Sequence, residues 1–133
     1  MNRVRFWGST LVLPDDISDK EVVHCFTRGQ CHSFARALHK LTGWQLAVLC
    51  HYPGAVNVQG DHVVCITPDN KLADITGVYE FGTKWLNLKT LVKVKPSTVQ
   101  KLGWDQQDIR AAMPYARNFL ERYQKDSPQT NQV

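Results

Sequence analysis

Three residue types that cooperate in nucleophilic catalysis occur in order along the middle of the chain. Cys31 stands in the stretch GQCHSFARAL at 29–38, His62 in DHVVCI at 61–66, and Asp74 in LADITG at 72–77. A cysteine thiolate attacks a carbonyl carbon, a histidine moves the proton, and a carboxylate orients the histidine. The sequence therefore predicts that Cys31 is a nucleophile, His62 its general base and Asp74 the group that orients the base.

Cys31 is expected to lie in the first turn of a helix over 31–41. Apolar residues recur at helical spacing at Phe34, Ala37, Leu38 and Leu41. Gly43 supplies a C-terminal stop. Unpaired N–H groups and the helix dipole at a first turn favour a negative charge, which suits a thiolate.

His62 and Asp74 are expected on the two strands of a hairpin, 61–67 and 71–75. Side chains alternate faces along a strand, so the two share a face only if the loop has an odd number of residues. A five-residue loop would place them directly opposite, and a three-residue loop at 68–70 would make them diagonal neighbours. A two-residue loop would separate them. The sequence does not choose among these lengths.

The segments around the hairpin predict further strands and one short helix. Residues 4–13 read as an extended segment interrupted by Gly8. Asp16 or Ser18 is expected to cap a short helix that follows. A buried strand is predicted over 44–51 from its continuous apolar run.

The second half of the chain turns from strand to helix. A loop is expected at 77–82 and a strand at 88–94. An apolar stripe at helical spacing then runs from Trp104 to Leu120. Pro114 is expected to kink that helix or to mark its first turn.

Length and composition indicate one globular domain. The chain has 133 residues, of which 43% are hydrophobic and 21% charged. The predicted fold class is α+β: the helix that begins at Cys31 packs on an antiparallel sheet, and a C-terminal helix covers another part of it. The domain is expected to span 1–125, with 126–133 as a flexible polar tail.

Charge and hydropathy indicate which partners and which cellular location to expect. No apolar run approaches the ~18 residues of a membrane-spanning helix, so no membrane partner is expected. The basic N-terminus lacks the apolar core of a signal peptide, which predicts a cytoplasmic protein unless a dedicated system exports it. The net charge of +4 permits an acidic partner without requiring one. The lysines come without interleaved base-stacking aromatics, so no nucleic-acid partner is expected.

The cysteines also allow a different class of protein, a zinc-binding or non-catalytic interaction module. Cys/His pairs that could bind metal occur at 24–25, 31–32 and 50–51. No C-x-x-C knuckle accompanies them, and Cys31 heads a helix with an apolar face. Cys50 and Cys65 lie in strand-like runs and resemble small core hydrophobes. The enzyme hypothesis accordingly expects neither a metal nor a cofactor.

The motif around Cys31 resembles a known family. Gly29-Gln30-Cys31 followed by Phe34-Ala35 is similar to the Gly-Gln-Cys-Trp-x-Phe-Ala motif at the nucleophile helix of transglutaminases. His62 and Asp74 keep that family's order and strand context. The resemblance covers roughly 27–77 and is similar in plan to the wider papain-like superfamily. His32 stands where the family has tryptophan, and no calcium-binding loop is obvious.

The resemblance implies a papain-like or transglutaminase-like core that acts on a protein or peptide substrate. By it Cys31 is the nucleophile, His62 the base and Asp74 the orienting acid. The shared step is thiolate attack on an amide carbonyl, which serves a peptidase, an isopeptidase, a glutamine deamidase or an amine-transfer enzyme. The departures from the motif make hydrolysis a more secure expectation than amine transfer.

An oxyanion formed at Cys31 needs two hydrogen-bond donors. The backbone N–H of Cys31 is the natural first donor at a helix start. The second is either the Gln30 side chain or an indole such as that of Trp7. Gln30 is equally suited to a purely structural role.

Overall fold

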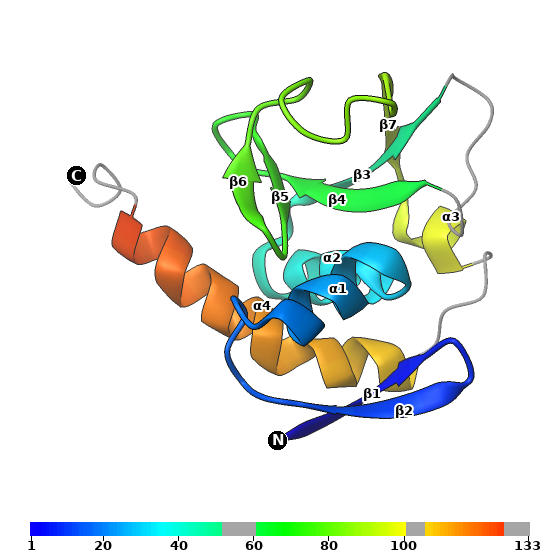
Figure 1. Ribbon diagram of the computed structural model, residues 1–133. Coiled ribbons are helices and arrows are strands. Elements are labelled where there is room, and N and C mark those ends of the chain that lie inside the picture. Colours follow the sequence, from blue (N-terminus) through cyan, green and yellow to red (C-terminus); the bar gives the residue numbers. More distant parts are fainter. Residues whose placement is uncertain (52–60, 101–105, 127–133) are drawn as a thin grey trace.

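A five-stranded antiparallel sheet lies on one side of two central helices, and a long helix with a separate hairpin lies on the other (Figure 1). The computed structural model describes residues 1–51, 61–100 and 106–126. The elements in chain order are β1 (Asn2–Phe6), β2 (Ser9–Leu13), α1 (Lys20–Arg28), α2 (Cys31–Thr42), β3 (Gln45–Cys50), β4 (His62–Ile66), β5 (Leu72–Asp74), β6 (Gly77–Tyr79), β7 (Thr90–Val94), α3 (Pro96–Gln100) and α4 (Gln106–Asp126). The predicted α+β class with helices on an antiparallel sheet is confirmed.

The sheet has the strand order β6-β5-β4-β3-β7 and buries both of its faces. Alternation along β4 sends Val63 and Cys65 into the core shared with α2 and α4, and Val64 to the opposite face. On that second face Val64 packs with Leu72 and with Leu88 from the β6–β7 connection. The strands therefore contain nearly continuous apolar runs, as expected of a sheet covered on both sides.

The β4–β5 hairpin has the three-residue loop, the second of the three lengths considered. The Thr67 N–H donates to the Lys71 carbonyl at 2.8 Å, which closes the ladder around residues 68–70. Asn70 adopts a positive φ of 65°, as the last residue of such a loop does. With Cys65 paired to Ala73, residue 74 is opposite residue 64. His62 and Asp74 are thus diagonal neighbours on one face.

Two predictions about strands were wrong. The extended segment expected over 4–13 is interrupted at Gly8 as predicted, but it folds back into a hairpin, because Trp7 and Gly8 both take positive φ, 50° and 82°, and reverse the chain. The expected loop at 77–82 begins with strand β6, which pairs with β5 so that Asp74 is opposite Gly77. Three residues are too few to show an alternating pattern in the sequence.

The helices begin and end for local reasons. Asp19, and not Asp16 or Ser18, caps α1: its carboxylate accepts from the Glu21 and Val22 N–H groups. The Asp16 carboxylate instead accepts from the N–H and hydroxyl of Ser18 in the preceding turn.

Helix α4 runs through Pro114 and does not begin there. Of the predicted stripe, Trp104 lies outside the described residues, as do residues 127–133 of the predicted tail. In the part of the chain that is described, no helix is long and apolar enough to cross a membrane.

Candidate active site

Cys31 is the first residue of α2, and its side chain is almost buried, with 6% of its surface exposed. The first intrahelical hydrogen bond runs from the Phe34 N–H to the Gln30 carbonyl. The N–H groups of Cys31, His32 and Ser33 therefore have no carbonyl of their own helix to bind. Gln30 occupies the N-cap position and makes no side-chain cap. The sulfur thus sits at the positive end of the helix dipole.

His62 joins Cys31 to Asp74. Its Nε2 lies 2.7 Å from Asp74 Oδ2, and the Cys31 side chain is close enough to the imidazole to raise the pKa of His62. Because Nε2 is hydrogen-bonded to Asp74, Nδ1 is the ring nitrogen that can interact with the sulfur. His62 and Asp74 are 3% and 2% exposed, so little solvent screens either contact. The three residues singled out in the sequence therefore lie together, with His62 hydrogen-bonded to Asp74 and next to the Cys31 side chain.

The surroundings of His62 favour its charged form. Burial alone would lower its pKa, but the hydrogen bonds to Asp74 and Cys31 and the negative charges there outweigh burial and raise the pKa to about 9. Burial likewise opposes the ionisation of Asp74, but the hydrogen bond and charge of His62 hold the pKa of Asp74 below its ordinary value. At neutral pH the imidazolium Nε2–H accordingly donates to the carboxylate of Asp74.

Asp74 is also held by residues that the sequence analysis did not single out. Oδ1 accepts from the N–H and the hydroxyl of Thr76, at 2.8 and 2.5 Å. Oδ2 accepts from the Tyr79 hydroxyl at 2.5 Å and from the Trp85 indole N–H at 3.3 Å. With His62 these donors fill the acceptor capacity of a carboxylate, about four lone-pair sites. Asp74 is therefore fixed in place and kept ionised.

Trp85 also lies against the imidazole. The two ring centroids are 4.3 Å apart with 38° between the planes, and the indole N–H reaches the Tyr79 hydroxyl at 3.0 Å. Trp85 holds this position with a positive φ of 57°, which is uncommon for a residue other than glycine. Tyr79 lies in the segment 77–82 that was expected to be a loop, and Trp85 lies between that segment and the strand expected at 88–94, so neither residue was predicted to belong to the site.

The two candidates for the second oxyanion donor lie on either side of the helix start. The Gln30 amide donates from Nε2 to the Arg5 carbonyl at 2.7 Å and accepts from the Ser33 hydroxyl at 2.7 Å. These contacts give Gln30 the structural role of tying β1 to α2. Trp7 is 68% exposed at the β1–β2 turn, and its Nε1 lies 3.0 Å from the point a Cβ at residue 29 would occupy. Gly29 is thus required by the close approach of the indole.

The other cysteines occupy the core. Cys25, Cys50 and Cys65 are fully buried, and burial raises the pKa of Cys25 and of Cys65 to about 12. The Cys65 thiol donates to the Ala35 carbonyl, as expected of a small core residue. Among the described residues, no three His, Cys, Asp or Glu side chains gather in a way that could hold a metal ion.

Comparison with known proteins assigns no family to the chain. No protein-family model, no curated protein and no solved structure matches it. The likeness to the transglutaminase motif therefore depends on the residues quoted above, and the functional argument depends on the geometry of the site.

Proposed function

We propose that this chain is a cysteine-dependent acyl-transfer enzyme that acts on amide bonds of a protein or peptide. The observation that supports the proposal is the buried cluster of Cys31, His62 and Asp74, in which the histidine is hydrogen-bonded to the carboxylate and lies beside the cysteine. A helix start that presents a cysteine to a strand histidine, with an aspartate on the next strand, is also the plan of a papain-like or transglutaminase-like core.

The first half-reaction forms an acyl-enzyme. The Cys31 thiolate attacks the amide carbonyl carbon, a C–S bond forms, and the carbonyl electron pair moves onto oxygen. The oxyanion returns its electron pair, the C–N bond breaks, and the leaving nitrogen takes the proton from the His62 imidazolium. Asp74 keeps Nε2 as the donor side of the ring and stabilises the imidazolium before that transfer.

The second half-reaction resolves the thioester. Water or an amine attacks the acyl carbon while Nδ1 of the neutral His62 takes its proton. The C–S bond then breaks, which restores thiolate and imidazolium. The backbone N–H of Cys31 is the first oxyanion donor, and the second is the Trp7 indole or the second amide N–H of Gln30. Because Gln30 is already held on both ends of its amide, we favour Trp7.

Trapping of the acyl-enzyme tests this function. The full chain is incubated with candidate proteins and glutamine-containing peptides, quenched with acid, and weighed intact. We expect an adduct of the acyl group on wild type and none on Cys31→Ala. His62→Ala should form little adduct, because no group then protonates the leaving nitrogen. An adduct that persists on Cys31→Ala would move the nucleophile elsewhere.

A further inference from the structure

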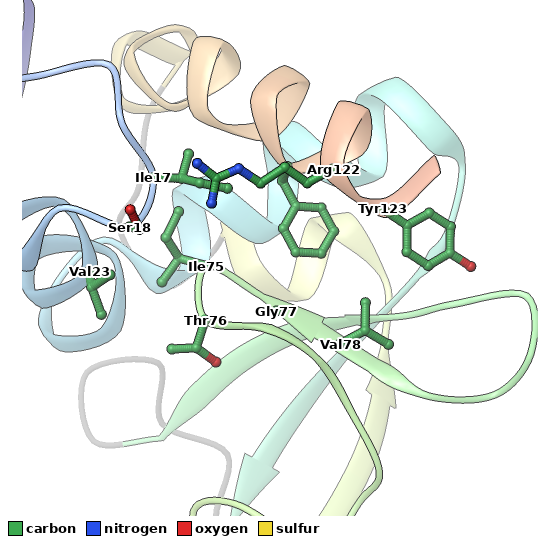
Figure 2. Close-up of a pocket in the computed structure, with 10 residues that line it drawn as sticks. Ile17, Ser18, Val23, Ile75, Thr76, Gly77, Val78, Arg122 and Tyr123 are labelled. Carbon is green, nitrogen blue, oxygen red and sulfur yellow. The ribbon is translucent and has the colours of Figure 1, made fainter. Parts of the chain in front are cut away.

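A pocket of about 570 Å³ opens next to the candidate active site (Figure 2). It lies between the β2–α1 connection, the β5–β6 turn and the C-terminal part of α4. Its lining consists of Ile17, Ser18, Val23, Ile75, Thr76, Gly77, Val78, Phe119, Arg122 and Tyr123. Its volume is in the range of pockets that bind small ligands or several side chains, ~300–1,000 Å³. Neither Cys31 nor His62 lines it.

Residues on two walls of the pocket are connected to the candidate active site, one through the chain and one through a hydrogen bond. Val23 belongs to α1, which ends at Arg28, just before Cys31. On the other wall, the Thr76 hydroxyl donates to Asp74. Thr76, Asp74 and His62 therefore connect this wall to the Cys31 side chain, over a span on the order of 14 Å. About four residues of extended polypeptide cover that distance.

The lining is apolar except at one side. The apolar side chains of Ile17, Val23, Ile75, Val78 and Phe119 belong to the lining. Arg122 is the single charged residue among those that line it, and Figure 2 shows its guanidinium reaching toward Ile17 and Ser18. The Arg122 guanidinium donates to Asp16 Oδ1 at 3.3 Å, and this ion pair occupies only one of the five guanidinium N–H donors. The pocket therefore suits an apolar group that has an anionic neighbour.

Strand β6 gives this pocket a backbone edge. β6 is an edge strand of the sheet, so only one of its two sides pairs with another strand of the sheet. Val78, opposite Ala73, belongs to the non-hydrogen-bonded pair of the short hairpin, which directs its N–H and carbonyl away from β5. Its side chain is 37% exposed and lines the pocket. An extended segment can pair with such an edge while it inserts a side chain beside it.

We propose that this pocket docks the polypeptide substrate: an extended segment places a large apolar side chain in the pocket, with an acidic residue next to it against Arg122, a few residues from the amide that reacts at Cys31. The inference rests on the proposed function and adds to it a substrate class, acidic segments with an apolar anchor.

The test compares electrophilic peptides on the full-length chain. Each peptide carries one chloroacetamide side chain in place of the reacting amide, and a Leu-Glu pair is moved through successive positions on either side of it. Reference peptides carry Ala-Lys or Leu-Lys instead. Labelling of Cys31 is followed by peptide mapping, and each rate is divided by the iodoacetamide rate of the same protein. The variants are Val78→Trp, which fills the pocket, and Arg122→Glu, which reverses its charge.

We expect one spacing at which Leu-Glu labels Cys31 at least about tenfold faster than Ala-Lys. Val78→Trp should abolish that preference, and Arg122→Glu should turn it toward Leu-Lys. Val12→Trp is the matched control, because Val12 is an exposed strand valine that does not line the pocket. Equal labelling at every spacing, or a preference that survives both pocket variants, overturns the docking proposal. If iodoacetamide does not select Cys31 over the other cysteines, the proposed function fails first.

Discussion

Asp74→Asn should change both the protonation of His62 and the pH dependence of stability. The substitution removes the negative charge that offsets the desolvation cost of the buried imidazolium, while His62 itself stays buried. We therefore expect the pKa of His62 to fall from about 9 toward its ordinary value of 6.5, while the neighbouring Cys31 continues to raise it. Asparagine also offers one acceptor oxygen where the carboxylate offered two. Either the Thr76 donors at Oδ1 or the His62 and Tyr79 donors at Oδ2 then face an amide NH₂ group.

The size of the effect follows from the raised pKa. A shift from 6.5 to about 9 corresponds to about 3 kcal/mol of unfolding free energy, at ~1.4 kcal/mol per pKa unit. The folded pKa of His62 is higher than the unfolded one, so this contribution is fully present below pH ~6.5 and is lost as the pH rises through about 9. Asp74 has a lowered folded pKa, so its contribution is present above pH ~4 and is lost as the pH falls below that value.

Urea unfolding of the wild type and of Asp74→Asn, from pH 5 to pH 9, measures this difference directly. The gap in unfolding free energy should be largest near pH 5–6 and shrink toward pH 9 by up to about 3 kcal/mol, the value for complete loss of the His62 shift. NMR titration of the imidazole gives the two pKa values of His62 independently. Asp69→Asn is the matched control, since Asp69 is exposed and bonds to Thr67. A gap that stays constant with pH, or a wild-type His62 that titrates near 6.5, refutes this reasoning.

Three further perturbations test the surroundings of the site and the fold. Tyr79→Phe removes one donor to Asp74 and should cost about 1.5–3 kcal/mol in urea unfolding; NMR titration should still find a raised pKa for His62, because Asp74 keeps its charge, and a drop to 6.5 would contradict this. Gly29→Ala places a Cβ 3.0 Å from Trp7 Nε1 and 3.1 Å from the Phe6 ring, so thermal unfolding should show a loss of about 1 kcal/mol; no loss would mean that the hairpin yields freely. Asp19→Ala removes the cap of α1 and should cost ~1 kcal/mol, whereas Asp15→Ala, just outside the cap, should cost much less.

Cys31, His62 and Asp74 could be recognised from the sequence, whereas the residues that hold His62 and Asp74 in place could not. Cys31 could be placed at a helix start because Phe34, Ala37 and Leu38 recur at helical spacing, a signal that extends over three turns. The relation of His62 to Asp74 depended on a loop length, and Pro68-Asp69-Asn70 is compatible with more than one. The outcome was decided by the tertiary structure, which pairs Cys65 with Ala73.

The residues around Asp74 could not be predicted because short elements have no periodicity. Strand β6 has three residues, and Trp85 reaches the site from an irregular connection with a positive φ. Trp7 and Gly8 reverse the chain between two strands that read as one extended segment. The role of Gln30 was open because its partners, the Arg5 carbonyl and the Ser33 hydroxyl, become neighbours only when β1 packs on α2.

The central claim is that His62 activates the sulfur of Cys31, and pulse alkylation measures this most directly. A short iodoacetamide pulse at pH 7, followed by peptide mapping, compares Cys31 with Cys25, Cys50 and Cys65 in the wild type and in His62→Ala. We predict that Cys31 is labelled well ahead of the three core cysteines in the wild type, and that His62→Ala removes this lead while the protein remains folded. Equal labelling of Cys31 in both proteins, or no lead over the core cysteines in the wild type, would contradict the account.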